Sequence, residues 1–357
     1  MERKRKIVLE NGQEFHGIGF GANCDSLNEL VFNTSMAGYQ EIISNPSCAG
    51  QTVVMTYPVI GNYGITDEDF ESKTPTIGGL IVREYNDSPS NFRYTKTLSE
   101  ILEENQIPGI SEIDTRMLTR IIREQICNKV LITDAATPTE IALQKLKAYT
   151  NPTDMVNLVS CKKKWYSRTA NHTYNVVAVD CGIKHNIIRV LNQKGCNVTV
   201  VPYKIKAEEI LDLSPDGLII SNGPGNPEDV PPVINLIKNL MSKLPIFGIG
   251  LGHQLIALAC GAKTYKMKLG HRGSYPVLNI DTEKIEITAQ GHSYAVDMNS
   301  VRKTCLRVTH VNILDDTAEG IESMENKLYS VQYYPESAPG PRDSAYVFDK
   351  FIDMMEK

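Results

Sequence analysis

The chain has 357 residues, of which 41% are hydrophobic and 22% charged, and its formal net charge at pH 7 is −5. This length predicts two domains that each bury a core, and the composition is typical of a soluble globular protein. An acidic chain is not expected to bind nucleic acid or an anionic membrane. It contains no run of about 18 apolar residues, and no apolar signal-peptide core follows its basic start, so we expect a cytoplasmic protein.

The eight cysteines are scattered, and no Cys-x-x-Cys pair occurs among them. In a cytoplasmic protein this pattern predicts reduced thiols rather than disulfides or a zinc site. We therefore expect no metal in this chain.

The first part of the chain predicts a mixed α+β domain over residues 1–150. It opens with a hairpin around Asn11-Gly12. Further strands are expected over residues 29–33, 52–58, 79–84 and 129–133, and helices over residues 98–106, 115–124 and 137–148. Residues 151–172 have a weaker pattern and are expected to connect this domain to the next.

Residues 173–357 predict an α/β domain, because short apolar strands alternate with helical patterns from Tyr174 on. Strands are expected over residues 175–180, 197–201, 217–221 and 246–249, with helices over residues 183–191, 206–213 and 232–241. This alternation predicts a mostly parallel sheet with flanking helices on both faces. After Lys266 we expect shorter strands and a final helix over residues 343–355.

Three loops at expected strand ends carry candidate chemistry. In the loop Ser221–Pro227, Gly223 and Gly225 expose backbone N–H groups that could hold an oxyanion. Gly250 lies between an apolar strand and a helix, where α/β proteins usually present reactive groups. The third loop follows a strand and ends with the carboxylate of Glu336.

Glycines 248, 250 and 252 also invite a comparison with dinucleotide-binding turns. The third glycine comes one residue early, and the basic Lys266 and Lys268 follow where an acidic residue is expected. The sequence therefore favours a catalytic elbow over a nucleotide site.

Longer motifs make the resemblance specific and cover essentially the whole chain. The second half resembles class I glutamine amidotransferases, and the first half resembles the amino-terminal domain of the small subunit of carbamoyl phosphate synthetase. The matching segments are Val31–Glu41, Thr56–Gly64, Asn91–Arg93, Gly109–Arg116, Asp180–Lys184, Ser221–Pro227, Leu251–Gln254 and Gly270–Gly273.

The resemblance implies a reaction and a partner. In this family a cysteine attacks the amide of glutamine, a histidine activates the thiol, and a glutamate orients the histidine. The released ammonia passes to a large subunit, which makes carbamoyl phosphate from bicarbonate and ATP for arginine and pyrimidine synthesis. ATP and metal are expected only on that large subunit, and this chain is expected to need no cofactor.

This chain departs from the family pattern where catalysis occurs. Gly250 stands at the nucleophile position, and Tyr334 stands at the position of the base, so that only Glu336 of the catalytic set is kept. Glycine cannot form a thioester, and a tyrosine with a pKa of about 10 is a poor base at neutral pH. We therefore predict a subunit that has lost glutaminase activity.

The glutamine pocket is expected to be partly kept. Gly291 replaces an asparagine of the family pattern, which predicts weakened glutamine binding, and the segment after Gly273 is one residue shorter than usual. The remaining positions implied as glutamine contacts or oxyanion donors are Ser47, Gly223, Gly225, Leu251, Gln254, Ser293 and Tyr294.

Several alternatives stay open at this stage. Cys48 and Cys181 lie near motif loops, and Cys48 follows a pocket position, so Cys48 is the thiol to examine as a relocated nucleophile. Cys260 is expected to be a small hydrophobic residue of its helix. His253 is expected to pack or cap its helix, and His292 and His310 to be structural or solvated. The chain could also be a non-enzymatic amino-acid-binding or regulatory protein, or an ordinary enzyme with engineered substitutions.

Overall fold

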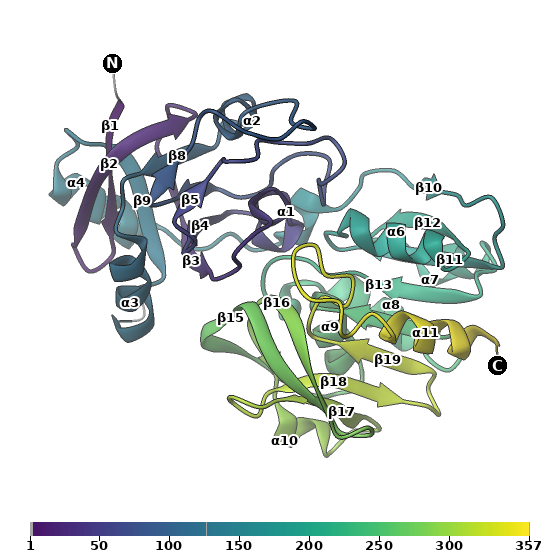
Figure 1. Cartoon of the computed structure of the whole chain (residues 1–357). Coiled ribbons are helices and arrows are strands. Elements are labelled where there is room, and N and C mark those ends of the chain that lie inside the picture. Colours follow the sequence, from purple (N-terminus) through teal and green to yellow (C-terminus); the bar gives the residue numbers. More distant parts are fainter. Residues whose placement is uncertain (1–2, 126, 357) are drawn as a thin grey trace. The chain divides into compact units, whose positions relative to one another are not determined.

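The computed structural model describes residues 3–125 and 127–356. The chain divides into two compact units, residues 1–152 and 153–357. Each unit is described by itself (Figure 1). Within the described residues, no helix has the length and apolar character needed to cross a bilayer.

The first unit is built on a closed barrel with the strand order β1-β2-β8-β6-β4-β3-β9. Alternate residues of its strands face opposite sides, so Val31 and Val53 pack with helices α1 and α2, whereas Leu30 and Phe32 lie in the same cluster as residues of α3. The strands are β1 (Arg3–Leu9), β2 (Glu14–Gly21), β3 (Ser26–Asn33), β4 (Gln51–Met55), β5 (Val59–Ile60), β6 (Gly79–Ile81), β7 (Glu84–Tyr85), β8 (Pro108–Ser111) and β9 (Lys129–Asp134), and the helices are α1 (Tyr39–Ile43), α2 (Leu98–Glu104), α3 (Thr115–Gln125) and α4 (Thr139–Ala148).

The second unit contains a ten-stranded sheet with the order β10-β12-β11-β13-β14-β19-β18-β16-β15-β17. Strands β12, β11, β13, β14 and β19 pair in parallel, and antiparallel strands extend the sheet at both edges. The strands are β10 (Trp165–Ser167), β11 (Tyr174–Asp180), β12 (Cys196–Pro202), β13 (Gly217–Ile220), β14 (Ile246–Ile249), β15 (Thr264–Asn279), β16 (Lys284–Val296), β17 (Arg307–Asn312), β18 (Ala318–Ser323) and β19 (Leu328–Val331).

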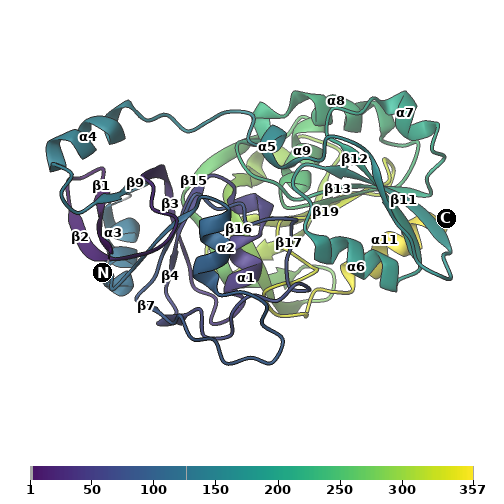
Figure 2. The same ribbon diagram turned by 90° about the horizontal axis from the view of Figure 1, so that it is seen from above.

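Helices cover both faces of the parallel part of this sheet, as Figure 2 shows. On β11, Val177 and Val179 face the helices α7, α8 and α9, whereas Val176 and Ala178 face α6 and α11. This arrangement confirms the predicted α/β fold class. The helices are α5 (Val156–Val159), α6 (His185–Gln193), α7 (Ala207–Leu211), α8 (Pro231–Leu240), α9 (Leu251–Ala259), α10 (Met298–Val301) and α11 (Val347–Glu356).

Two segments differ from the expectation. Residues 151–172, expected to connect the units, contain α5 and β10, and β10 pairs with β12. The strands after Lys266 are long rather than short, since β15 has 16 residues and β16 has 13. A register shift between Lys266 and His271 interrupts the side-chain alternation of β15, which is why its period of two was not visible as one strand.

Candidate active site

Gly250 forms the turn between β14 and α9. Its backbone angles are φ 60° and ψ −108°, a conformation that only glycine adopts without strain. The following Gly252 lets α9 approach β13 closely, because a Cβ atom there would lie 2.1 Å from the carbonyl oxygen of Ile220. The sequence therefore folds here into the predicted elbow, which presents position 250 at the carboxyl end of the sheet.

The elbow faces Tyr334. Strands β14 and β19 are parallel neighbours, with Ile249 opposite Val331, so their carboxyl ends bring Gly250 and Tyr334 to the same edge. A Cβ atom built on Gly250 would lie 3.5 Å from Cε1 of Tyr334 and 3.3 Å from Cβ of Asn222. The two positions that the sequence resemblance implies for nucleophile and base are thus adjacent, and neither carries a thiol or an imidazole.

Tyr334 is held in place at both ends. Its backbone N–H donates to the carbonyl oxygen of Ala289 at 2.8 Å, and its hydroxyl donates to the carbonyl oxygen of Gly291, also at 2.8 Å. The residue is only 6% exposed. Because the hydroxyl of Tyr334 donates a hydrogen bond to a carbonyl oxygen, it is not placed to accept a proton from a nucleophile at position 250.

Gly291 provides the space for the tyrosine. A Cβ atom on Gly291 would lie 3.0 Å from both Cε2 and the hydroxyl oxygen of Tyr334. These distances are shorter than ordinary van der Waals contacts between carbon atoms. The glycine at position 291 and the tyrosine at position 334 are therefore sterically matched.

Glu336 has an ionic partner although the histidine is absent. Oε1 of Glu336 lies 2.8 Å from Nζ of Lys184, and the two side chains are 0% and 1% exposed. The ammonium group also donates to the carbonyl oxygen of Ser337 at 2.5 Å and lies 4.7 Å from the ring centroid of Tyr334. Oε2 of Glu336 is buried without a hydrogen-bond partner.

Lys184 was missed as a site residue by the sequence reasoning. It lies in the motif segment Asp180–Lys184, which was noted for its resemblance alone. The motif begins with Asp180, whose carboxylate accepts from the N–H groups of Gly182 and Ile183 at 2.9 Å. That turn directs the chain into α6 and brings Lys184 to Glu336. The available signal in the sequence was a lysine four residues after the motif aspartate, just before a helical pattern.

The structure also brings together most pocket positions of the second unit. Cβ on Gly223 would lie 2.8 Å from Cδ2 of Leu251 and 2.2 Å from the carbonyl oxygen of Cys181, so this loop is tightly packed against the elbow. Gln254 is 3% exposed, and its amide donates to the carbonyl oxygen of Tyr294 at 2.7 Å.

Three further positions have other contacts or belong to the other unit. A Cβ atom on Gly225 would contact Met155 at 3.2 Å rather than the elbow, and Ser293 accepts a hydrogen bond from Arg272 at 2.7 Å. Ser47 belongs to the first unit, where its N–H donates to Oδ1 of Asn45. Its role as a glutamine contact stays a prediction.

The remaining candidates for a base or nucleophile in this unit are buried or, in the case of Cys260, partly buried. His253 is fully buried, and burial lowers its pKa to about 3, while its Nδ1 lies 3.0 Å from Oγ of Ser330. Burial raises the pKa of Cys260 to about 12 and that of Cys181 well above its ordinary value. These thiols are therefore protonated at neutral pH and are poor nucleophiles.

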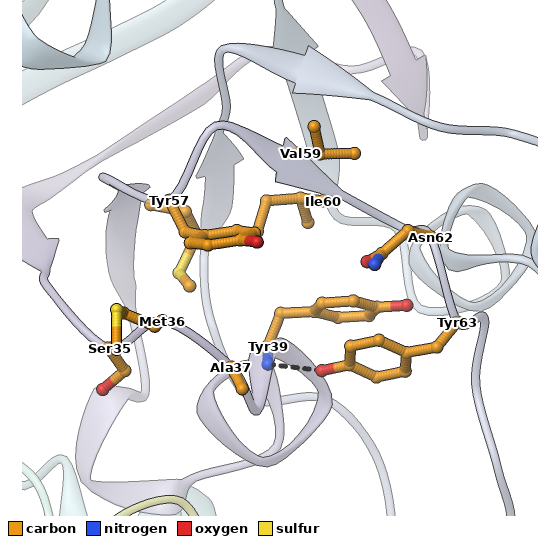
Figure 3. Close-up of a pocket in the computed structure, with 10 residues that line it drawn as sticks. Ser35, Met36, Ala37, Tyr39, Tyr57, Val59, Ile60, Asn62 and Tyr63 are labelled. Atoms are coloured by element: carbon orange, nitrogen blue, oxygen red, sulfur yellow. Dashed lines mark hydrogen bonds between the residues drawn. The ribbon is translucent and has the colours of Figure 1, made fainter.

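A separate pocket of about 230 Å³ lies in the first unit (Figure 3). Tyr39 and Tyr63 stack on one side of it with ring centroids 4.1 Å apart, and the N–H of Tyr39 donates to the hydroxyl of Tyr63. Cys48, the thiol considered as a relocated nucleophile, does not line this pocket and is 7% exposed. Apart from Ser35 and Asn62, the lining side chains are aromatic or aliphatic. The lining contains no cysteine, aspartate or glutamate.

An elbow at the end of a parallel strand, an adjacent glycine loop and a carboxylate after the next strand define the class I glutamine amidotransferase arrangement. The family model of glutamine amidotransferase class-I matches residues 177–354, and that of the carbamoyl-phosphate synthase small chain matches residues 7–132. The chain belongs to the carbamoyl phosphate synthase small chain family, which confirms the resemblance seen in the sequence.

The relatives match along the full chain. The carbamoyl phosphate synthase small chain of Staphylococcus saprophyticus is 49% identical over 100% of this chain and 97% of its own length. The pyrimidine-specific small chain of Bacillus subtilis is 50% identical over 99% of this chain and 96% of its own. Among solved structures, a glutamine amidotransferase from Thermotoga maritima is 20% identical, with a TM-score of 0.39, over 52% of this chain and 85% of its own.

Proposed function

We propose that this chain is a small chain of carbamoyl phosphate synthase that no longer hydrolyses glutamine and acts as a structural subunit of an ammonia-using complex. The observation that carries the proposal is the pairing of Gly250 with Tyr334. The elbow offers no thiol, and Tyr334, which faces it, donates a hydrogen bond from its hydroxyl to the carbonyl oxygen of Gly291.

The size of the expected loss supports this function. Removing the nucleophile or the base of a serine protease triad lowers kcat by about a million-fold, and removing both costs little more. A chain without either group is expected to retain at most the small contribution of substrate binding. Glutamine hydrolysis at an ordinary rate is therefore not expected.

The steric match between Gly291 and Tyr334 favours natural divergence over an engineered knockout. An engineered change of the nucleophile alone would leave an unchanged pocket around it. Here Tyr334, which faces the elbow, and Gly291, which contacts Tyr334, both differ from the family pattern, and the glycine leaves the space that the tyrosine fills.

The partner we propose is a carbamoyl phosphate synthase large subunit. The relatives over the whole length of this chain are small chains by name, including one described as pyrimidine-specific. ATP, metal and the synthetic reaction would belong to the large subunit, and the product would supply pyrimidine or arginine synthesis. The first unit keeps several motifs of the family and has no part in attacking glutamine, so a docking role fits its retention.

The direct test is glutamate release from glutamine by the purified chain, alone and mixed with a large subunit. We expect no release above the background of a heat-inactivated sample. Release at the rate of an intact family member, measured in parallel, would disprove the loss of glutaminase activity.

A non-enzymatic amino-acid-binding function is the alternative. It is favoured by Gln254, which lies in the first turn of the elbow helix α9 and donates a hydrogen bond to the backbone carbonyl of Tyr294. Titration calorimetry with glutamine separates the two functions. Heat that saturates at millimolar glutamine or below would favour a binding protein, whereas no heat would leave the structural subunit.

A further inference from the structure

A pair of histidines and a glutamate converge in the antiparallel part of the sheet. His271 on β15 lies directly opposite His292 on β16, and their ring centroids are 4.9 Å apart. Glu319 comes from β18, which pairs with β16. One potential ligand atom from each of the three lies within 4.8 Å of the others.

All three side chains are buried, and several of their polar atoms have no hydrogen-bond partner. The residues His271, His292 and Glu319 are 5%, 8% and 0% exposed. Both ring nitrogens of His292 and Oε2 of Glu319 are buried and unpaired. Because native proteins pair the great majority of buried polar atoms, three unpaired atoms in one cluster need a partner such as an ion or a water molecule.

His271 is oriented as a metal ligand would be. Its Nε2 lies 2.8 Å from a carboxylate oxygen of Asp315, and its Nδ1 lies 3.4 Å from both Oε1 of Glu319 and the amide nitrogen of Asn312. A carboxylate that accepts from the second nitrogen of a ligating histidine is the usual outer contact of a metal site.

The separation between His271 and Glu319 suits a shared ion. Nδ1 of His271 is 3.4 Å from Oε1 of Glu319. A charge-assisted hydrogen bond is usually about 2.7–2.9 Å. Two ligands about 2.1 Å from a tetrahedral zinc ion would instead be roughly 3.4 Å apart.

The charges around the cluster are compatible with a cation. Glu319 and Asp315 contribute two carboxylates, and Arg272 is the cation next to His292, with its guanidinium bound to Ser293.

We propose that His271, His292 and Glu319 bind a divalent transition-metal ion of the zinc type and thereby tie β15, β16 and β18 together. The ion would hold His292 through a ring nitrogen and so fix the neighbouring Gly291 beside Tyr334. Two histidines and one carboxylate leave one position of a tetrahedral ion for water. The proposal does not depend on the loss of glutaminase activity.

The test uses the full-length chain after chelation and dialysis. Titration calorimetry with ZnCl₂ should give one tight site per chain. His292→Gln and Glu319→Gln should each weaken binding at least tenfold, and Asp315→Asn, which changes a partly exposed residue, should weaken it by about 10–100-fold. His16→Gln, which alters an exposed histidine of the first unit, is the matched control and should leave binding unchanged.

Cobalt provides a second readout that distinguishes this cluster from the cysteines. Co²⁺ bound by imidazole and carboxylate gives visible ligand-field bands without a thiolate charge-transfer band, and these bands should be lost in Glu319→Gln. No stoichiometric binding by the wild-type chain would overturn the proposal. So would a thiolate charge-transfer band, or binding that His292→Gln, Glu319→Gln and Asp315→Asn all leave intact.

Discussion

Tyr334 occupies the space that a side chain at position 291 would need, since a Cβ atom on Gly291 would lie 3.0 Å from the ring and the hydroxyl of Tyr334. The hydroxyl in turn bonds to the carbonyl oxygen of Gly291 at 2.8 Å. Two departures from the family pattern, 43 residues apart in the sequence, therefore form one contact. This contact lies on the side of the elbow where the sequence resemblance implies a base.

The first prediction concerns this contact. Gly291→Ala should destabilise the chain by about 1–3 kcal/mol, because the added methyl group overpacks against Tyr334. Tyr334→His should relieve the overlap, so the double variant should lose less than the sum of the two single variants. Urea unfolding of the four proteins measures this coupling. Additive losses would show that the two positions do not constrain each other.

Restoring catalysis should require more than the nucleophile. Gly250→Cys places a thiol near Tyr334 without a base, so we expect no glutamate release from that variant. With Tyr334→His added, the unpaired Oε2 of Glu336 is available to orient the new imidazole. Adding Gly291→Asn as well should give measurable release, and steady-state assays of the three variants test this order. Turnover by Gly250→Cys alone would indicate another base.

The buried ion pair makes a stability prediction. Lys184→Met should destabilise the chain by about 3–5 kcal/mol, because Glu336 would remain buried without its cation. Lys194→Met is a suitable control, since Lys194 pairs with Asp349, a side chain that is 62% exposed. That control should cost less than about 1 kcal/mol in chemical denaturation. Equal losses would mean that Lys184 does not compensate the charge of Glu336.

His310 should make stability depend on pH. Burial, reinforced by the positive charge of Lys350, lowers its pKa from 6.5 to about 4. The unfolded chain therefore binds a proton that the folded chain does not, and stability is complete above the unfolded pKa and falls as the pH drops toward the folded one. Between about pH 7.5 and about pH 5 this group should cost roughly 2 kcal/mol.

The matched variants for this pH effect are His310→Gln and His16→Gln. Urea unfolding at both pH values should show a smaller difference for His310→Gln than for the wild-type chain. His16 has a side chain that is 64% exposed, so His16→Gln should behave as the wild-type chain does. An unchanged pH difference in His310→Gln would contradict the predicted proton linkage.

Local patterns predicted the elements around the elbow well. The apolar run before Gly250 and the helical pattern after it became β14 and α9, and the hairpin around Asn11-Gly12 became β1 and β2. These features depend on neighbouring residues, and their signals lie within short windows of sequence.

Long-range pairings could not be read in the same way. The contact of Lys184 with Glu336 joins the loops that follow β11 and β19, two strands that β13 and β14 separate in the sheet. No periodic pattern in the sequence marks such an ion pair. His271 and His292 face each other only because β15 shifts register after Lys266, and no spacing in the sequence marks them as a pair. Barrel closure by the pairing of β1 with β9 is equally non-local.

The most direct test of the proposed function is carbamoyl phosphate synthesis by this chain reconstituted with a large subunit, with ammonia and glutamine supplied in parallel reactions. The account predicts that the two chains co-purify, that ammonia supports synthesis, and that glutamine supports none above background. Synthesis from glutamine at a rate comparable to that from ammonia would contradict it.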